Sequence, residues 1–163
     1  MRNLTILGAT GSIGASSLKV VEQNPDLYSV VALAAGSNVE KMLALVEKWQ
    51  PSYVAMACPD AASQLADTLS INHPNIQVFS GPEGMCKVAS LDEVHTVMAA
   101  IVGAAGLLPT MAAVKAGKRI LLANKEALVM SGQLFIDAVE KYGAELLPVC
   151  LLYTSDAADD QLG

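Results

Sequence analysis

Residues 4–14 read LTILGATGSIG, a short apolar run followed at once by three glycines spaced three residues apart. An apolar strand that ends in a glycine-rich turn and opens into a helix is typical of dinucleotide-binding folds. Gly8 is expected to allow the tight turn, Gly11 to let the backbone approach a pyrophosphate, and Gly14 to let the helix pack on the strand. The helix N-terminus would then offer free N–H groups to phosphates. The alternative is an ordinary glycine-rich turn between a strand and a helix.

Outside this stretch, short β-rich runs alternate with helical segments, which is typical of βα units on a parallel sheet. A proline follows Asn24 and Gln50 and indicates helix ends, and Gly117 and Gly143 stand where helices favour a left-handed cap. We predict an α/β fold: a Rossmann-like, doubly wound, mainly parallel sheet with helices on both faces, in the strand order 3-2-1-4-5-6. The predicted strands are Leu4–Leu7, Val30–Ala34, Tyr53–Met56, Ile76–Phe79, Thr96–Ile101, Arg119–Leu122 and Glu145–Val149, and the predicted helices are Ser12–Asn24, Val39–Gln50, Asp60–Ser70, Gly84–Ala89, Thr110–Ala116 and Gly132–Tyr142.

Composition narrows the class of protein. A chain of 163 residues fits one domain, and a hydrophobic fraction of 53% suits strands covered on both faces. The net charge of −6 argues against nucleic acid as a partner. The longest apolar stretch, Val97–Val114, contains glycine and proline, so it is interpreted as a strand, a loop and a helix start rather than a membrane span. The first apolar run ends at Gly8, too early for a signal peptide. We therefore expect a cytoplasmic protein without a membrane partner.

The three cysteines and two histidines carry no expected chemistry. Cys58, Cys86 and Cys150 are odd in number and widely spaced, which favours free thiols over a disulfide or a metal site. His73 and His95 have no catalytic partner nearby in the sequence, and both are interpreted as structural.

The end of the second predicted strand indicates which dinucleotide would bind. NAD-binding proteins usually place Asp or Glu there to hold the ribose hydroxyls. Here no carboxylate follows that strand before Glu40. NADP is therefore favoured, with Ser37, Asn38 and the N-terminus of the next helix as donors to a 2′-phosphate. No Arg or Lys stands at this corner, and Lys41 follows one turn later.

Two further segments follow strand ends at the edge where open α/β sheets bind ligands. Val102–Gly106 consists of small residues that leave room for a flat nicotinamide ring, or it is a loop kept small for packing. Ala123–Glu126 places Lys125 between Asn124 and Glu126. That lysine could hold a phosphate or polarise a carbonyl, or the Lys-Glu pair is simply a solvated helix start.

Three stretches together resemble the 1-deoxy-D-xylulose 5-phosphate reductoisomerase family: Leu4–Gly14, Met98–Leu107 and Leu121–Glu126. The resemblance implies a sugar-phosphate substrate bound by Lys125, a divalent metal (Mg or Mn), a homodimer of the full-length enzyme, and conversion of 1-deoxy-D-xylulose 5-phosphate to 2-C-methyl-D-erythritol 4-phosphate in non-mevalonate isoprenoid biosynthesis. It also implies NADPH contacts from Thr10, Gly11, Ser12, Ile13, Gly36, Ser37, Asn38, Asn124 and Glu126. Some members carry a basic residue at the position of Ser37.

The resemblance stops after Val149, where the family continues with an Asp-Ser-Glu segment that holds the metal. We expect residues 1–149 to form an NADPH-binding domain and residues 150–163 to be a non-family tail from read-through, a frameshift or a cloning scar. The catalytic and C-terminal domains would then be missing, so no catalytic or metal-binding residue is assigned and the fragment is expected to be inactive alone. The alternative is a non-catalytic dinucleotide-binding module. A short-chain dehydrogenase is excluded, because no Tyr is followed four residues later by Lys.

Overall fold

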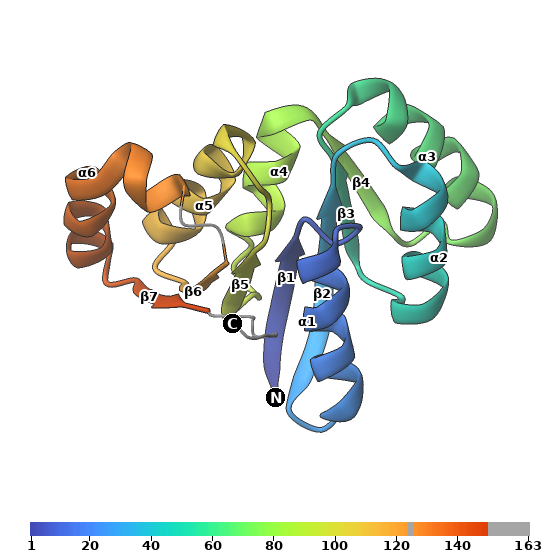
Figure 1. Ribbon diagram of the computed structural model, residues 1–163. Helices are drawn as coiled ribbons and strands as arrows, with labels where there is room; N and C mark the ends of the chain where they lie inside the picture. Colours follow the sequence, from blue (N-terminus) through green and yellow to red (C-terminus); the bar gives the residue numbers. More distant parts are fainter. Residues whose placement is uncertain (124–125, 150–163) are drawn as a thin grey trace.

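The computed structural model describes residues 1–123 and 126–149, which form one seven-stranded sheet flanked by helices (Figure 1). The strand order is β4-β3-β2-β1-β5-β6-β7, and every neighbouring pair is parallel. The predicted tail, residues 150–163, lies outside the described residues. The strands are β1 (Arg2–Leu7), β2 (Tyr28–Ala35), β3 (Tyr53–Met56), β4 (Gln77–Ser80), β5 (Thr96–Ala99), β6 (Arg119–Leu122) and β7 (Glu145–Pro148).

The helices divide into two layers. Side chains of α1, α2 and α3 share one apolar cluster with one face of the sheet, and side chains of α4, α5 and α6 share a second cluster with the other face. This division follows from the right-handedness of parallel crossovers, because the chain moves in one direction from β1 to β4 and in the opposite direction from β4 to β7. The helices are α1 (Ser12–Gln23), α2 (Val39–Trp49), α3 (Pro59–Asn72), α4 (Gly81–Ala89), α5 (Leu107–Lys115) and α6 (Glu126–Tyr142), with a 3₁₀ turn η1 at Ala104–Gly106.

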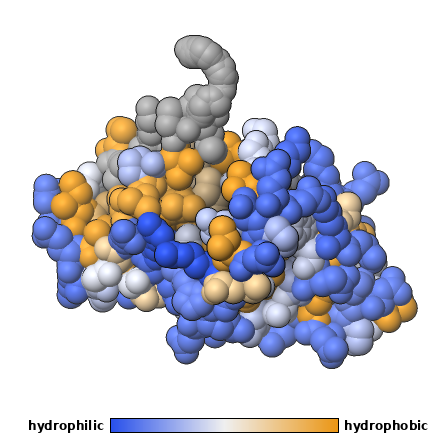
Figure 2. All heavy atoms as spheres, turned by 90° about the horizontal axis from the view of Figure 1, so that it is seen from below, coloured by the Kyte–Doolittle hydropathy of each residue, from blue (hydrophilic) through white to orange (hydrophobic). Residues whose placement is uncertain are grey.

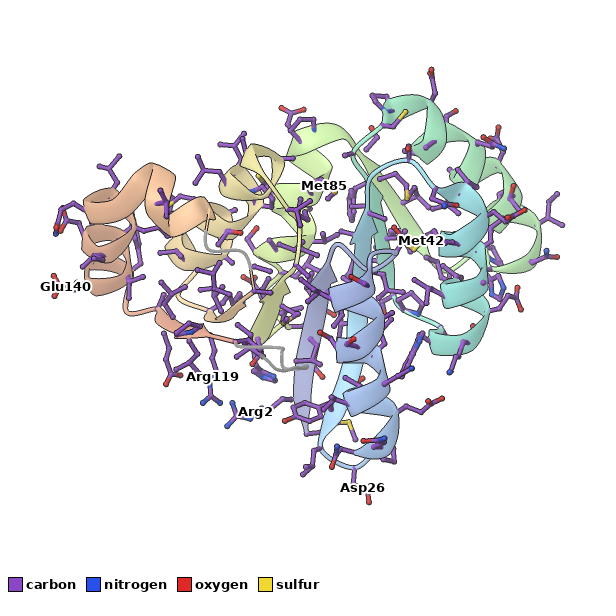
Figure 3. The ribbon with its side chains drawn as sticks, in the orientation of Figure 1. Arg2, Asp26, Met42, Met85, Arg119 and Glu140 are labelled. Carbon is purple, nitrogen blue, oxygen red and sulfur yellow. The ribbon has the colours of Figure 1, made fainter. Side chains whose placement is uncertain are left out.

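The two apolar clusters form the core. Leu33 of β2 and Met42 of α2 are fully buried in the first cluster (Figure 3 labels Met42), and Ile120 of β6 and Phe135 of α6 are fully buried in the second. Each such side chain contributes about 1.5–3 kcal/mol through removal of its surface from water. The predicted fold class is confirmed: the sheet is doubly wound, parallel among the described residues, and covered by helices on both faces.

The predicted strand order is wrong in one respect. The fourth strand was expected beside the first, but β4 extends the sheet outside β3 and β5 takes the place beside β1. The reason is that the short α4 after β4, rather than α3, makes the long return across the sheet. The chain therefore reverses its direction across the sheet after β4, one strand later than predicted.

Three predicted helix starts are also wrong: the fourth helix was expected at Gly84 but begins at Gly81. The fifth helix was expected at Thr110 but begins at Leu107, and the Thr110 hydroxyl donates back to the Gly106 carbonyl at 2.6 Å from inside the helix. The sixth was expected at Gly132 but begins at Glu126, and Gly132 marks a kink within it, with φ 32° and ψ −106°. By contrast, Gly117 and Gly143 have the predicted positive φ, at 73° and 69°.

The histidines are structural, but each has a partner that the sequence did not indicate. The Nε2 atom of His73 lies 2.7 Å from the Glu47 carboxylate, and the Nδ1 atom of His95 accepts the backbone N–H of Asn3 at 2.9 Å. Among the described residues, no helix has the length and hydrophobicity to cross a membrane. Cys58 and Cys86 are free thiols, as predicted, while Cys150 lies outside the described part.

Candidate functional site

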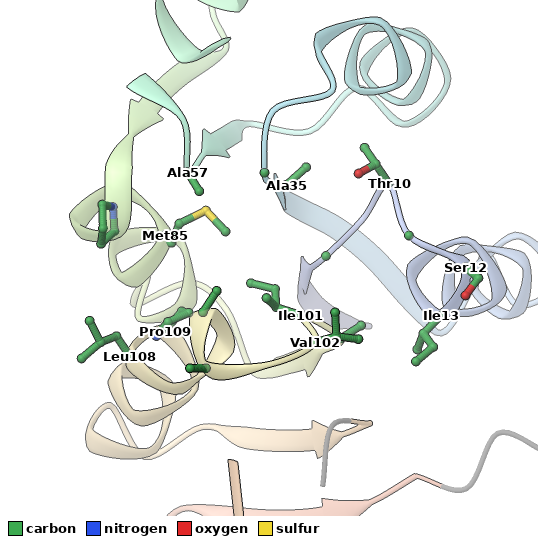
Figure 4. Close-up of a pocket in the computed structure, with 17 residues that line it drawn as sticks. Thr10, Ser12, Ile13, Ala35, Ala57, Met85, Ile101, Val102, Leu108 and Pro109 are labelled. Atoms are coloured by element: carbon green, nitrogen blue, oxygen red, sulfur yellow. The ribbon is translucent and has the colours of Figure 1, made fainter. Parts of the chain in front are cut away.

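A cleft of about 570 Å³ opens at the carboxyl edge of the sheet, where the chain direction switches (Figure 4). The edge is the one at which open α/β sheets bind ligands. The lining of the cleft is mainly apolar, and none of the described residues that line it carries an ionisable side chain. The lining residues are Gly8, Thr10–Ile13, Ala35, Gly36, Ala57, Pro82, Met85, Ala100–Val102, Ala104, Ala105, Leu108 and Pro109.

The loop after β1 forms one wall and is fixed by its backbone. The N–H groups of Gly8 and Ala9 both donate to the Ala34 carbonyl, each at 2.9 Å. Gly8 has φ +82°, and a Cβ there would lie 2.6 Å from the Ala100 carbonyl oxygen. Only glycine meets both conditions, so Gly8 lets β1 turn sharply while the loops after β1 and β5 touch.

The other two glycines of the motif differ sharply in their surroundings. A Cβ on Gly14 would lie 2.3 Å from the Gly8 carbonyl oxygen and 2.8 Å from the Cα of Ala9. Gly14 is thus required for α1 to pack on its own loop. A Cβ on Gly11 would meet only that same oxygen, at 3.5 Å, which is ordinary contact. Packing inside the protein therefore does not explain Gly11, whereas a ligand approaching its backbone from the cleft would.

Within the described part of the chain, no side chain caps the N-terminus of α1. Its cap residue is Gly11, which has no side chain to accept a helix N–H, and its first turn contains no acidic residue. The first N–H groups of a helix have no partner within the helix. The backbone N–H groups of Ser12 and Ile13, whose residues line the cleft, are therefore placed to receive an anion at the positive end of α1.

The corner after β2 is built differently. The Oδ1 atom of Asn38 accepts the N–H of Lys41 at 3.0 Å and caps α2, and Glu40 stands in the first turn. The N–H of Val39 donates to the Ser37 carbonyl at 3.0 Å. The α2 N-terminus thus has fewer free donors than the sequence suggested. The Asn38 Nδ2 group takes no part in this cap, which uses only the Oδ1 atom.

The small-residue loop after β5 lines the cleft, as predicted. Ala104 and Ala105 line the cleft. At its edge, Val102 is 71% exposed and Leu108 of α5 is 62% exposed. Gly106 lets the loop close tightly, because a Cβ there would meet the Ile101 carbonyl oxygen at 2.7 Å. The loop is therefore both kept small for packing and open to a ligand.

The predicted site residues separate into three groups. Gly8, Thr10–Ile13 and Gly36 line the cleft, whereas Gly14 supports the loop from behind. Ser37 and Asn38 lie at the next corner and do not line it. Asn124 and Lys125 fall outside the described residues, and Glu126 opens α6 with a side chain that is not described.

The sequence reasoning missed the far wall of the cleft. Ala57 follows β3, and Pro82 and Met85 come from the first turns of α4 (Figure 4). Met85 is 4% exposed and reaches the cleft from beneath Ala57. Its helix was expected to begin only at Gly84, and nothing in the local pattern linked it to the glycine loop. The missed signal was the Gly81-Pro82 pair, which starts α4 at the cleft edge.

Groups with shifted pKa values lie away from the cleft. A hydrogen bond to Glu93 at 3.0 Å raises the pKa of Tyr53, and burial raises the pKa of the Cys86 thiol. Burial lowers the pKa of Lys118, whose Nζ donates to the Leu91 carbonyl at 2.6 Å. In residues 1–123 and 126–149 there is also no group of three His, Cys, Asp or Glu side chains able to hold a metal ion. This part of the chain therefore offers a binding cleft without an acid, a base or a metal centre.

Comparison with known proteins agrees with this geometry. A model of the 1-deoxy-D-xylulose 5-phosphate reductoisomerase family matches residues 4–132. The 1-deoxy-D-xylulose 5-phosphate reductoisomerase of Aliivibrio salmonicida is 70% identical over 149 residues, which cover 91% of this chain and 37% of that protein. A crystal structure of DOX-P reductoisomerase with NADPH, fosmidomycin and magnesium is 48% identical, with a TM-score of 0.88 over 91% of this chain and 36% of the other. The Zymomonas mobilis enzyme in complex with NADPH is 40% identical, with a TM-score of 0.83 over 91% and 38%.

Sheet order, glycine loop and cleft position together define a Rossmann-type α/β domain. Within that class, the chain belongs to the 1-deoxy-D-xylulose 5-phosphate reductoisomerase family. It spans little more than a third of the length of the relatives that it matches.

Proposed function

We propose that residues 1–149 bind NADPH in the cleft and serve as the cofactor-binding part of an enzyme that isomerises and reduces 1-deoxy-D-xylulose 5-phosphate to 2-C-methyl-D-erythritol 4-phosphate. The observation that carries the proposal is Gly11, at the N-terminus of α1, a glycine that no contact with the described residues requires. The pyrophosphate would lie against Gly11 and accept the N–H groups of Ser12 and Ile13. The family relatives crystallised with NADPH support this assignment.

The 2′-phosphate would lie at the corner after β2. Gly36 leaves open space there, and neither Ser37 nor Asn38 brings a negative charge. The Nδ2 group of Asn38 and the hydroxyl of Ser37 are the proposed donors. Because no carboxylate occupies the position that NAD-binding proteins use for the ribose, NADPH should bind more tightly than NADH.

The nicotinamide would extend toward the loop after β5, over Ala104 and Ala105. Asn124 and Glu126 are proposed to complete the cofactor site, and Lys125 to contact the phosphate of the substrate. When bound, NADPH would supply the hydride for the reduction, and the apolar cleft would orient its ring.

The metal does not fit the described part of this chain. A relative was crystallised with magnesium, but residues 1–123 and 126–149 contain no suitable ligand cluster. We therefore assign no metal ligand and no metal-dependent step to these residues. We also propose a homodimer of the longer enzyme, which the family resemblance implies, and a cytoplasmic location, which the sequence pattern favours.

Calorimetry with NADPH and NADH tests the proposal. The wild-type chain should prefer NADPH, and Gly11→Ala should bind it about ten- to a hundredfold more weakly, as expected for the loss of one to two charge-assisted hydrogen bonds. The thermal unfolding midpoint of Gly11→Ala serves as the control and should stay close to wild type, because the new methyl meets only ordinary contact. Equal affinity for NADH, or normal NADPH binding by the variant, would contradict the proposal.

A turnover assay separates the enzyme from the non-catalytic dinucleotide-binding module. With sugar phosphate, Mg²⁺ and NADPH, the 163-residue chain should bind cofactor without consuming it, since its described residues offer no acid, base or metal ligand at the cleft. In a protein extended by the family's downstream sequence, turnover should appear, and Lys125→Ala should lower kcat/KM by roughly ten- to a hundredfold.

A further inference from the structure

Among the described residues, part of the sheet has one face that no helix covers. On the side of α1, the apolar cluster draws its helical residues only from α1, α2 and α3, which lie over β1 to β4 (Figure 1). On that side, no described helix lies over β6 and β7, whereas Met98 of β5 is already buried in the α1–α3 cluster. Parallel strands are normally covered on both faces, because their apolar side chains point both ways.

Strand order makes this bare face unavoidable. The chain passes from β4 through β5 and β6 to β7 in a single direction. Right-handed crossovers in that direction place α4, α5 and α6 on the opposite face. No connection between the strands of this sheet can therefore supply a helix to the bare side, and its cover has to come from polypeptide outside the seven-stranded unit.

The side chains on this face form rows across the three strands. The register places Met98, Leu121 and Leu147 side by side, in line with Ile6 of β1. A groove of about 230 Å³ runs between this apolar row and α1, with Val20 of the helix on its rim. Val20 is 53% exposed. An apolar row beside a groove of this kind matches the ridge of an amphipathic helix.

A polar row borders the apolar one at the amino edge. Thr96, Arg119 and Glu145 are aligned by the same register, and the Arg119 Nε atom lies 3.2 Å from the Glu145 carboxylate (Figure 3 labels Arg119). Thr96 is 3% exposed, and its hydroxyl has no hydrogen-bond partner among the described residues. Buried hydroxyls are normally hydrogen-bonded, and Thr96 is an exception within the described part of the chain.

We propose that this face is the docking site for an amphipathic helix from the polypeptide that follows β7 in the longer proteins of the family. Val149, the residue after β7, lines the groove, so a chain continuing from it starts at the docking site. The curated relative is matched over only 37% of its length, which leaves ample polypeptide for the role. The helix would place apolar side chains on Leu121 and Leu147, which are only half-buried.

A second copy of the chain fits this face less well. Helix α1 stands above the sheet beside the groove and blocks a flat approach of two sheets (Figure 1). A single helix, by contrast, fits beside α1 at the usual spacing of about 8–10 Å between packed helices. It would complete the α1–α3 layer over the whole sheet. This proposal is independent of NADPH binding.

Cysteine accessibility tests the proposal. Val20→Cys is made in the 163-residue chain and in residues 1–149 joined to the downstream sequence of the Aliivibrio salmonicida relative. Its alkylation rate is followed by peptide mass spectrometry, so that the native cysteines do not interfere. Ile71→Cys, on α3 and 80% exposed, is the matched control. We expect Val20→Cys to react about tenfold or more slowly in the extended protein, and Ile71→Cys to react equally in both.

Three outcomes would overturn the proposal. Equal reactivity of Val20→Cys in the two proteins would mean that the face stays bare. Protection that disappears on dilution would assign the face to a second copy. Equal slowing at Ile71→Cys would reflect general shielding rather than docking at the groove. The NADPH affinity of both proteins, measured in the same samples, shows separately whether the cofactor proposal holds.

Discussion

The two halves of the sheet differ in what covers them. Strands β1 to β4 have helices on both faces, whereas over β6 and β7 the helices of the described residues lie only on the side of α4, α5 and α6. The surface reflects the difference: seen from below, apolar side chains gather on the side of β7 and α6, while the side of α2 and α3 is mainly hydrophilic (Figure 2). The handedness of the crossovers thus leaves one half of the sheet covered by its own helices on both faces. The other half needs polypeptide from elsewhere to cover its second face.

The first and largest test compares one substitution in both halves. Leu33 of β2 and Leu121 of β6 face the same side of the sheet, but Leu33 is fully buried and Leu121 only partly. Leu33→Ala should lower the free energy of unfolding by about 3–5 kcal/mol and Leu121→Ala by roughly 1–2 kcal/mol, since less surface and a smaller cavity are involved. Urea titration measures both. Equal losses would show that the two halves are equally covered.

The second test examines the glycine loop of the covered half. Gly14→Ala should destabilise the protein by about 1–3 kcal/mol, because the new methyl overlaps the backbone of Gly8 and Ala9. Gly11→Ala is the matched control, with a loss expected within about 1 kcal/mol. Differential scanning calorimetry compares the loss of stability of the two variants. A stable Gly14→Ala would mean that α1 does not need close contact with its loop.

The third test concerns Lys118, the residue directly before β6. Burial lowers the pKa of this lysine, with Asp92 acting in the opposite direction. Between the folded pKa and the ordinary lysine pKa the unfolded state binds more protons, so this group makes stability rise with pH in that window. Lys118→Met should remove that rise. Unfolding free energies of both proteins across alkaline pH give the difference, and parallel curves would contradict the assignment.

The fourth and smallest effect is expected at the corner after β2. Ser37→Arg adds an exposed cation beside the proposed 2′-phosphate site, where a surface charge contributes about 0.5–1 kcal/mol. Affinity for NADPH should rise a few-fold, and affinity for NADH should stay the same. Ser29→Arg, at the amino end of β2 and so at the opposite edge of the sheet, is the control for net charge. Equal gains for both cofactors would place the 2′-phosphate elsewhere.

Features that depend on local chemistry could be predicted from the sequence. The glycine loop, the left-handed residues Gly117 and Gly143, and the loop at Val102–Gly106 each follow from steric rules that operate within a few residues. The strand ranges also agreed closely, because each strand is a short apolar run with clear boundaries.

Features that depend on long-range packing could not be predicted. The position of β4 follows from which helix makes the return crossing, and no local pattern encodes that choice. Met85 enters the cleft only because α4 crosses beneath the loops after β1 and β3. Likewise, the Asn38 cap reduces the donors at α2 through a side-chain rotamer that sequence alone does not reveal.

The central position of β1 has a consequence for how the chain folds as it is synthesised. On one side β1 pairs with β2, which follows in the sequence after a single helix, and on the other with β5, where the contact between Asn3 and His95 spans 92 residues. Local pairings form faster than distant ones. Strands β1 to β4 can therefore assemble on the ribosome before β5 and α4–α6 are made. At that stage the edge of β1 that later pairs with β5 and the face that α4 later covers are both exposed. Leu7 and Val31, which end up beneath α4–α6, are then the residues that a nascent-chain chaperone would meet.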